Sequence, residues 1–94
     1  MRKIRIVLAD DHRLFRDGLR RLLEMEKDME VIGEAEDGDA TVEMVSALKP
    51  DVLLFDIHMP KKDGIQVVKD LKAMGCSPRF VAITAFDDDD HITA

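Results

Sequence analysis

The sequence predicts an α/β domain built on a doubly wound parallel sheet, and two observations lead to that prediction. Short apolar runs rich in Ile, Leu and Val alternate along the chain with longer segments whose apolar residues recur at helical spacing. The short runs are also apolar along most of their length, which is typical of strands buried on both faces of a sheet. Alternating strands and helices favour parallel pairing, and right-handed crossovers leave only a few doubly wound strand orders.

Four strands are expected, each a short apolar run bounded by charged or turn-forming residues. They cover Ile4–Ala9, Glu30–Ala35, Asp51–Asp56 and Arg79–Thr84. The third run is the most apolar of the four.

Three helices are expected between these strands because apolar residues recur every three or four positions. The apolar face of the first helix, about residues 12–25, is formed by Leu14, Phe15, Leu19, Leu22 and Leu23. The second helix follows a turn at residues 37–39, with Asp39 as its N-cap, and ends before Pro50. The third helix, about residues 65–74, stops near Gly75, and residues 87–90 are expected to begin a fourth.

Composition excludes several classes of protein. Charged residues make up 36% of the chain and the formal net charge is −6, so the basic surface that binds nucleic acid is not expected in this segment. The single cysteine, Cys76, cannot form an internal disulfide, which fits a reducing compartment. No apolar stretch approaches the roughly 20 residues that span a bilayer, and no signal peptide is recognisable. We therefore expect a cytoplasmic protein without a membrane contact.

Acidic residues stand at the carboxyl ends of two predicted strands. Asp10 and Asp11 follow the first strand, and Asp56 closes the third. In a sheet of order 2-1-3-4 the ligand site lies between these two strands, so three carboxylates would meet there. Mg²⁺ prefers oxygen ligands and would relieve the repulsion between them. Thr84, at the end of the fourth strand, would add a hydroxyl beside the carboxylates.

Each of these residues also has an ordinary structural explanation. An isolated Asp pair such as Asp10 and Asp11 more often caps a helix. Asp56 is also typical of a turn, and Thr84 is a good strand former. His12 and the His58 side chain are expected to be loop or cap residues. The functional interpretation depends on the coincidence of suitable residues at the ends of three strands.

Three stretches, VLADDH, DVLLFDIHMPKKDG and VAITAF, together resemble the signature of receiver domains in two-component response regulators. The resemblance covers the whole chain and implies one receiver domain over residues 1–94 with a flavodoxin-like fold. The stretches LADDHRLFRDGLRRLLE, VIGEAEDG and TAFDDDDHI further resemble the branch with a C-terminal LuxR-type helix-turn-helix domain. The family's fifth strand and last helices have no counterpart here, so we expect a domain that is incomplete at its C-terminus.

The resemblance implies a role for each site residue. Asp56 would accept the phosphoryl group from a sensor histidine kinase or a phosphotransfer protein. Asp11 and Asp56 would ligate Mg²⁺ directly, Asp10 would do so through water, and the backbone carbonyl of His58 would complete the protein ligands. Thr84 would act as the switch hydroxyl. DNA would be bound by a separate C-terminal domain of the intact protein.

Two other functions remain open at this point. A Mg²⁺-dependent phosphohydrolase with an aspartyl phosphate commonly has a second acid two residues after its nucleophile, and His58 stands there instead. A non-phosphorylated interaction module would not need Asp10, Asp11, Asp56 and Thr84 together. We therefore expect a signalling domain rather than an enzyme. The fourth strand lacks its usual neighbour, so a homodimer or a swapped assembly through that edge is also expected.

Overall fold

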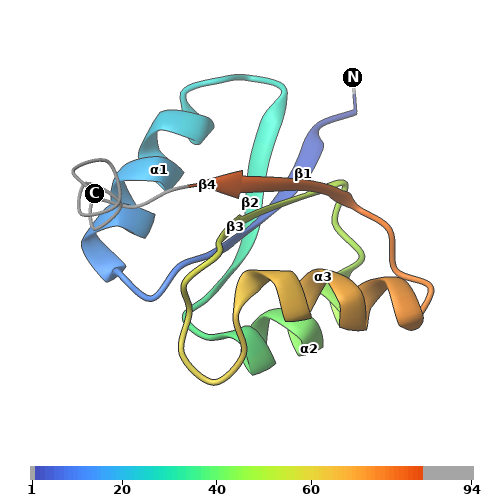
Figure 1. Cartoon of the computed structure of the whole chain (residues 1–94). Helices are drawn as coiled ribbons and strands as arrows, with labels where there is room; N and C mark the ends of the chain where they lie inside the picture. Colours follow the sequence, from blue (N-terminus) through green and yellow to red (C-terminus); the bar gives the residue numbers. More distant parts are fainter. Residues whose placement is uncertain (1, 84–94) are drawn as a thin grey trace.

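The structure is a computed structural model that describes residues 2–83, and in this range four strands alternate with three α-helices. The elements are β1 (Ile4–Ala9), α1 (Arg13–Glu24), β2 (Met29–Ala35), α2 (Gly38–Leu48), β3 (Val52–Asp56), α3 (Gly64–Ala73) and β4 (Arg79–Ile83). All neighbouring strands pair in parallel in the order β2-β1-β3-β4 (Figure 1). The predicted doubly wound sheet and its strand order are confirmed.

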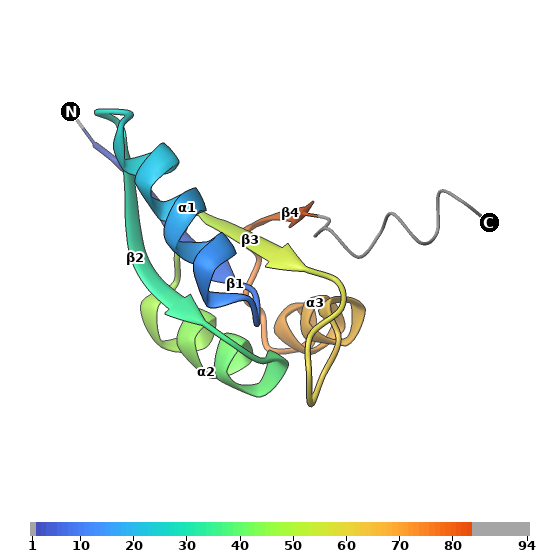
Figure 2. The same ribbon diagram turned by 90° about the vertical axis from the view of Figure 1, so that its left-hand side faces the viewer.

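The sheet separates two layers of helix. Helix α1 lies on one face, and α2 and α3 lie side by side on the other (Figures 1 and 2). Successive side chains of a strand point to opposite faces. Ile6 and Leu8 of β1 therefore pack toward α1, whereas Val7 and Ala9 pack toward α2 and α3.

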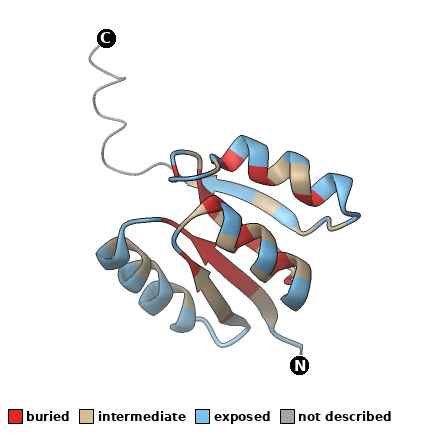
Figure 3. Ribbon diagram, turned by 90° about the horizontal axis from the view of Figure 1, so that it is seen from below, coloured by how far each residue is buried: buried red, intermediate tan, exposed pale blue. Residues whose placement is uncertain are grey.

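The two faces of the sheet are not buried to the same extent. The face under α2 and α3 holds a cluster of nine buried apolar residues: Val7, Ala9, Ala35, Val45, Leu53, Phe55, Met59, Val67 and Leu71. The face under α1 holds three, Ile6, Leu8 and Val31, with Leu19 and Leu23 of α1 packed against them. Figure 3 shows this difference: buried residues follow the central strands and the inner sides of α2 and α3, and α1 carries none.

The predicted apolar face of the first helix is only partly correct. Leu19 and Leu23 pack on the sheet, but Leu14 is 86% exposed and Leu22 is 64% exposed. Helical spacing identifies residues that share a side of a helix, but the neighbouring element decides how much of that side is covered. Within residues 2–83, the sheet reaches only part of this apolar side.

The N-cap of α2 is Asp37, and the prediction of Asp39 is wrong. The Asp37 side chain accepts a hydrogen bond of 2.8 Å from the backbone N–H of Ala40, and its backbone is extended as an N-cap requires. Asp39 lies in the first helical turn instead, with a carboxylate oxygen 3.6 Å from Lys62 Nζ. Gly38 is the first residue of the helix, and a Cβ there would lie 2.0 Å from the carbonyl oxygen of Lys62, so a side chain would not fit unless the backbone moved.

Strand β4 lies at an edge of the sheet within the described residues, as expected. Thr84 and the helical turn predicted at residues 87–90 lie outside those residues. None of the helices in residues 2–83 combines the length and the apolar character needed to cross a membrane.

Candidate functional site

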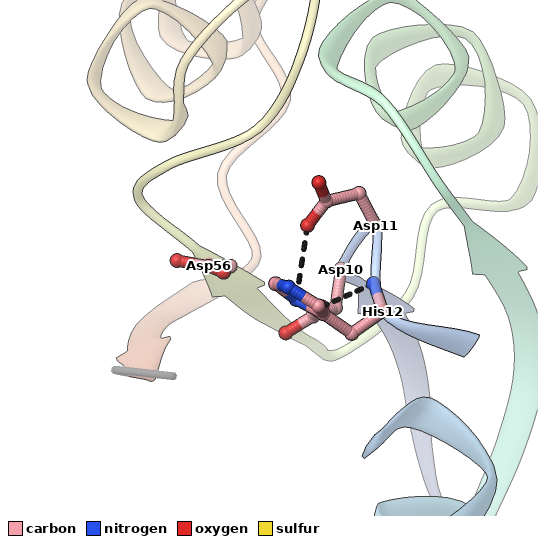
Figure 4. A group of neighbouring side chains, drawn as sticks. All are labelled: Asp10, Asp11, His12 and Asp56. Atoms are coloured by element: carbon pink, nitrogen blue, oxygen red, sulfur yellow. Dashed lines mark hydrogen bonds and ion pairs between the residues drawn. The ribbon is translucent and has the colours of Figure 1, made fainter. Parts of the chain in front are cut away.

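Acidic side chains meet where β1 and β3 end. Ala9 of β1 pairs with Phe55 of β3, so Asp10 and Asp56, the next residues, come out at the same edge of the sheet. Asp10 is 0% exposed and Asp56 is 2% exposed. Ligand atoms of Asp10, Asp11, His12 and Asp56 all lie within 4.8 Å of one another (Figure 4). The structure thus brings together the three carboxylates that the sequence placed at strand ends.

One oxygen of Asp10 is buried without a hydrogen-bond donor among residues 2–83. Asp10 Oδ1 accepts a hydrogen bond of 2.7 Å from the backbone N–H of His12, but Oδ2 accepts none from the described part of the chain. A buried acceptor without a donor costs free energy, and an ionised one costs more. A bound cation would offset that cost, and a set of carboxylate oxygens suits Mg²⁺. The residues therefore fit the metal that the sequence suggested.

The first helix is not capped by either Asp of the pair. Its N-cap is His12, and the His12 side chain makes no capping hydrogen bond. His12 Nδ1 instead lies 3.0 Å from Asp10 Oδ1 and 3.1 Å from Asp11 Oδ1 (Figure 4). The capping explanation for Asp10 and Asp11 is therefore wrong, and His12 places an imidazole in the carboxylate cluster that its sequence position did not predict.

The loop after Asp56 is fixed from both sides. The backbone N–H of His58 donates a hydrogen bond of 3.0 Å to Asp56 Oδ1. The Gly64 N–H donates to the Ile57 carbonyl at 2.7 Å, and the Gly38 N–H donates to the Pro60 carbonyl at 3.2 Å. These bonds tie the loop to α3 and α2, so the backbone around Asp56 is held before any ligand arrives. The metal role predicted for the His58 carbonyl stays a prediction.

The two lysines of this loop point toward helices. Lys62 Nζ donates a short hydrogen bond to Asp70 of α3, which raises the pKa of Lys62 and lowers the pKa of Asp70. Lys61 Nζ lies 3.7 Å from a carboxylate oxygen of Asp37. Both lysines therefore help to hold the loop against α2 and α3.

Sequence reasoning missed two charged residues beside the cluster. Arg16 donates from one guanidinium nitrogen to the backbone carbonyl of Asp10 at 2.6 Å and from Nε to Glu34 at 3.0 Å. Burial raises the pKa of Glu34, but its hydrogen bonds to Arg20 and Arg16 outweigh that effect, and the net pKa is lowered. The available signal was Glu34 itself, a charged residue inside a predicted strand.

Comparison with known proteins places this geometry in a family. Residues 6–94 match the family model of the response regulator receiver domain. The chain is 42% identical over 91 residues to the transcriptional regulatory protein DegU of Brevibacillus brevis, covering 97% of this chain and 39% of that protein. It is 43% identical over 89 residues to the transcriptional regulatory protein LiaR of Bacillus subtilis (strain 168), covering 95% and 42%. The chain therefore spans less than half the length of these relatives.

A solved structure has the same fold. The signal receiver domain of NarL from Mycobacterium tuberculosis superimposes with a TM-score of 0.87 at 39% identity, covering 99% of this chain and 75% of that one. Three observations indicate the same family: the strand order, these similarities, and the acidic edge, which is formed by Asp10, Asp11 and Asp56 where β1 and β3 end. The chain belongs to the response regulator receiver domain family.

Proposed function

We propose that this chain receives a phosphoryl group on Asp56 from a phosphohistidine of a sensor kinase or phosphotransfer protein. The observation that carries the proposal is the convergence of Asp10, Asp11 and Asp56 within 4.8 Å at one edge of the sheet. Family membership supports it, because Asp56 stands in the stretch that resembles the receiver signature most closely. Residues 1–94 are proposed to belong to a single receiver domain.

The donor set supports Mg²⁺ as the cofactor. Asp11 and Asp56 would ligate the ion directly, Asp10 would contact it through water, and the His58 carbonyl would complete the protein ligands. The buried Asp10 Oδ2, which accepts no hydrogen bond from residues 2–83, supports this assignment. When bound, Mg²⁺ supplies positive charge that offsets the carboxylates and the phosphoryl oxygens.

The residues of the chain would position the acceptor. An Asp56 carboxylate oxygen forms the new P–O bond while the P–N bond of the donor breaks, and the electron pair of that bond stays with the donor imidazole. The His58 N–H, which donates to Asp56 Oδ1, limits the rotation of the carboxylate. Thr84 is proposed as the switch hydroxyl that senses the phosphoryl group.

Intact-mass spectrometry after incubation with a small phosphodonor and Mg²⁺ tests the acceptor. Wild type should gain one phosphoryl group that hydroxylamine removes, and Asp56→Asn should gain none. Asp51→Asn is the matched control, because Asp51 lies just before the opposite end of the strand that Asp56 closes, and its replacement should leave labelling intact. Label that persists in Asp56→Asn would defeat the assignment.

The role in the intact protein is proposed from the relatives. DegU and LiaR are named transcriptional regulatory proteins, so phosphorylation is proposed to control DNA binding by a separate domain. We place the protein in the cytoplasm, where it would act as a signalling domain and not as a hydrolase. Turnover of added phosphate esters by the wild-type chain would contradict this.

A self-association through β4 is also proposed. One side of β4 pairs with β3, and its other side faces no strand within residues 2–83. Val81 at the middle of β4 is 36% exposed. Open strand edges of this kind pair with other chains. Ultracentrifugation of the purified chain should show concentration-dependent dimers that Val81→Lys weakens, and a monomer at all concentrations would refute the proposal.

A further inference from the structure

One side chain reaches from α1 to the peptide that joins Asp10 and Asp11, two of the three aspartates of the acidic edge. The Asp10 carbonyl belongs to the Asp10–Asp11 peptide unit, and it accepts a hydrogen bond of 2.6 Å from the Arg16 guanidinium. The Asp10 N–H donates to the Ala35 carbonyl of β2 at 3.0 Å. Because a peptide unit is planar, fixing this carbonyl also fixes the direction in which Asp11 leaves the strand.

Arg16 is itself held in place. Its Nε donates to Glu34 Oε1 at 3.0 Å, and the two side chains are only 11% and 18% exposed. Glu34 lies on β2 directly opposite Leu8 of β1, so it is anchored in the sheet. The forked guanidinium can serve both acceptors at once, which a single ammonium group cannot do with the same geometry.

Glu34 also offsets the positive charge of Arg16. A guanidinium beside a cation site should weaken cation binding by repulsion. Glu34 places a negative charge against Arg16, and its lowered pKa keeps that charge at neutral pH. Arg16 can therefore orient the peptide with its positive charge largely offset.

Arg20 provides an internal comparison. Its guanidinium contacts the other oxygen of Glu34 at 2.7 Å and also pairs with Glu24 at 3.4 Å. The Asp10 carbonyl accepts from Arg16, and no bond from Arg20 to that carbonyl is found among residues 2–83. The two arginines share the partner Glu34 but differ in their contact with the acidic edge.

We infer that Arg16 is a positioning residue that sets the orientation of the Asp10–Asp11 peptide and thereby prepares the Asp11 carboxylate to bind the divalent cation. The inference rests on the proposed function, because Mg²⁺ is the cation that the site is proposed to hold. It does not follow from charge, since a positive residue near a cation site would otherwise be unfavourable.

The test compares Arg16→Gln with Arg20→Gln. Both remove one positive charge and one partner of Glu34, so electrostatics alone predicts equal or tighter Mg²⁺ binding in both. Loss of positioning instead predicts that Arg16→Gln binds Mg²⁺ about tenfold more weakly by calorimetry, as for other residues that orient metal ligands. Arg20→Gln should stay within about twofold of wild type, because its charge is exposed and screened by salt.

Two further measurements separate positioning from folding. Arg16→Lys should recover part of the affinity, because its ammonium can still donate to the Asp10 carbonyl. The Asp11 amide belongs to the same peptide unit, and NMR relaxation of that amide in metal-free protein should show lost order in Arg16→Gln but not in Arg20→Gln. Thermal unfolding of both Gln variants measures the stability that each loses with its Glu34 contact.

Mg²⁺ binding by Arg16→Gln as tight as that of wild type would overturn the inference. A wild-type chain that binds no Mg²⁺ would overturn the proposed function instead. In that case the Asp11 amide alone decides: unchanged order in Arg16→Gln would show that Arg16 does not hold the peptide.

Discussion

The parallel strands begin at one edge of the sheet, the amino edge, and end at the other, the carboxyl edge. Both edges carry aspartates, but these aspartates differ in their hydrogen-bond partners. At the amino edge, Asp51 precedes β3, and both of its carboxylate oxygens have donors: Arg2 at 2.7 Å and the backbone N–H of Arg5 at 2.8 Å. At the carboxyl edge, Asp10 Oδ2 is buried and accepts no hydrogen bond from residues 2–83. A satisfied carboxylate stabilises the fold, whereas a buried one that lacks a donor stores a cost that a ligand can relieve.

The amino edge is a network of structural contacts. The Asp51 backbone donates to Arg5 of β1 and accepts from Arg79 of β4, so one residue joins three strands. The Arg5 guanidinium donates to the carbonyls of Leu48 and Lys49, where α2 ends. Each group here has a partner within the chain. The comparison teaches that hydrogen-bond satisfaction, and not the residue type, separates the structural edge from the edge that carries the candidate site.

Mg²⁺ should give the largest difference between the edges. A ligand that binds only the folded state at 100 times its dissociation constant raises the unfolding free energy by about 2.7 kcal/mol. We expect this stabilisation in wild type and in Asp51→Asn, and its loss in Asp11→Ala. Urea unfolding with and without Mg²⁺ measures it. Equal stabilisation of Asp11→Ala and wild type would mean that the ion binds elsewhere.

Removing the Asp51 carboxylate at the amino edge should have the second largest effect on the unfolding free energy. Asp51→Ala loses the acceptor for the Arg5 N–H, so the unfolding free energy should fall by about 1–2 kcal/mol. The ion pair with Arg2 should contribute little, because the Arg2 side chain is 78% exposed. Urea unfolding of Asp51→Ala and Arg2→Ala separates the two contributions. A larger loss in Arg2→Ala would show that the ion pair dominates this edge.

Asp10→Asn should change the unfolding free energy in the opposite direction and stabilise the fold. The Asn side-chain oxygen can still accept from the His12 N–H, while the buried charge disappears. Without Mg²⁺, the unfolding free energy should rise by about 1 kcal/mol, as when a buried carboxylate with one unsatisfied oxygen is neutralised. Thermal or urea unfolding in chelator measures this. A destabilised Asp10→Asn would place Asp10 in the same structural class as Asp51.

The smallest effect should come from Glu34, a carboxylate close to the acidic edge that is fully partnered. Its pKa is lowered in the folded state, because hydrogen bonds to Arg20 and Arg16 outweigh the effect of burial. It therefore stabilises the fold above the ordinary carboxyl pKa of about 4.3, and that contribution is lost as pH falls through the lowered pKa. At neutral pH, Glu34→Gln should cost up to about 1 kcal/mol.

Urea unfolding as a function of pH checks this expectation. The stability difference between wild type and Glu34→Gln should be present at neutral pH and should vanish in acid. A difference that grows as pH falls would show that Glu34 is destabilised by its surroundings. The number of hydrogen-bond partners would then not distinguish the structural carboxylates from those of the candidate site.

The sequence alone determined the parallel α/β class and limited the strand orders to a few, and the expected order 2-1-3-4 gave the place of the candidate site. Alternating apolar runs and helical segments imply parallel strands, and parallel strands end at a common edge. Asp10, Asp11 and Asp56 follow two such strands, so their meeting was predictable without coordinates. The predicted strands matched closely for the same reason, because a strand buried on both faces is apolar along its length.

Only the tertiary structure decided which charges are satisfied. Helical spacing could not show that Leu14 stays exposed, since that depends on what lies across from α1. Likewise, nothing in the local sequence carries the Arg16 guanidinium to the Asp10 carbonyl and to Glu34. Those contacts join α1 to the end of β1 and to β2. A side chain's partner across such a gap is fixed by the packing of whole elements and not by its position in the chain.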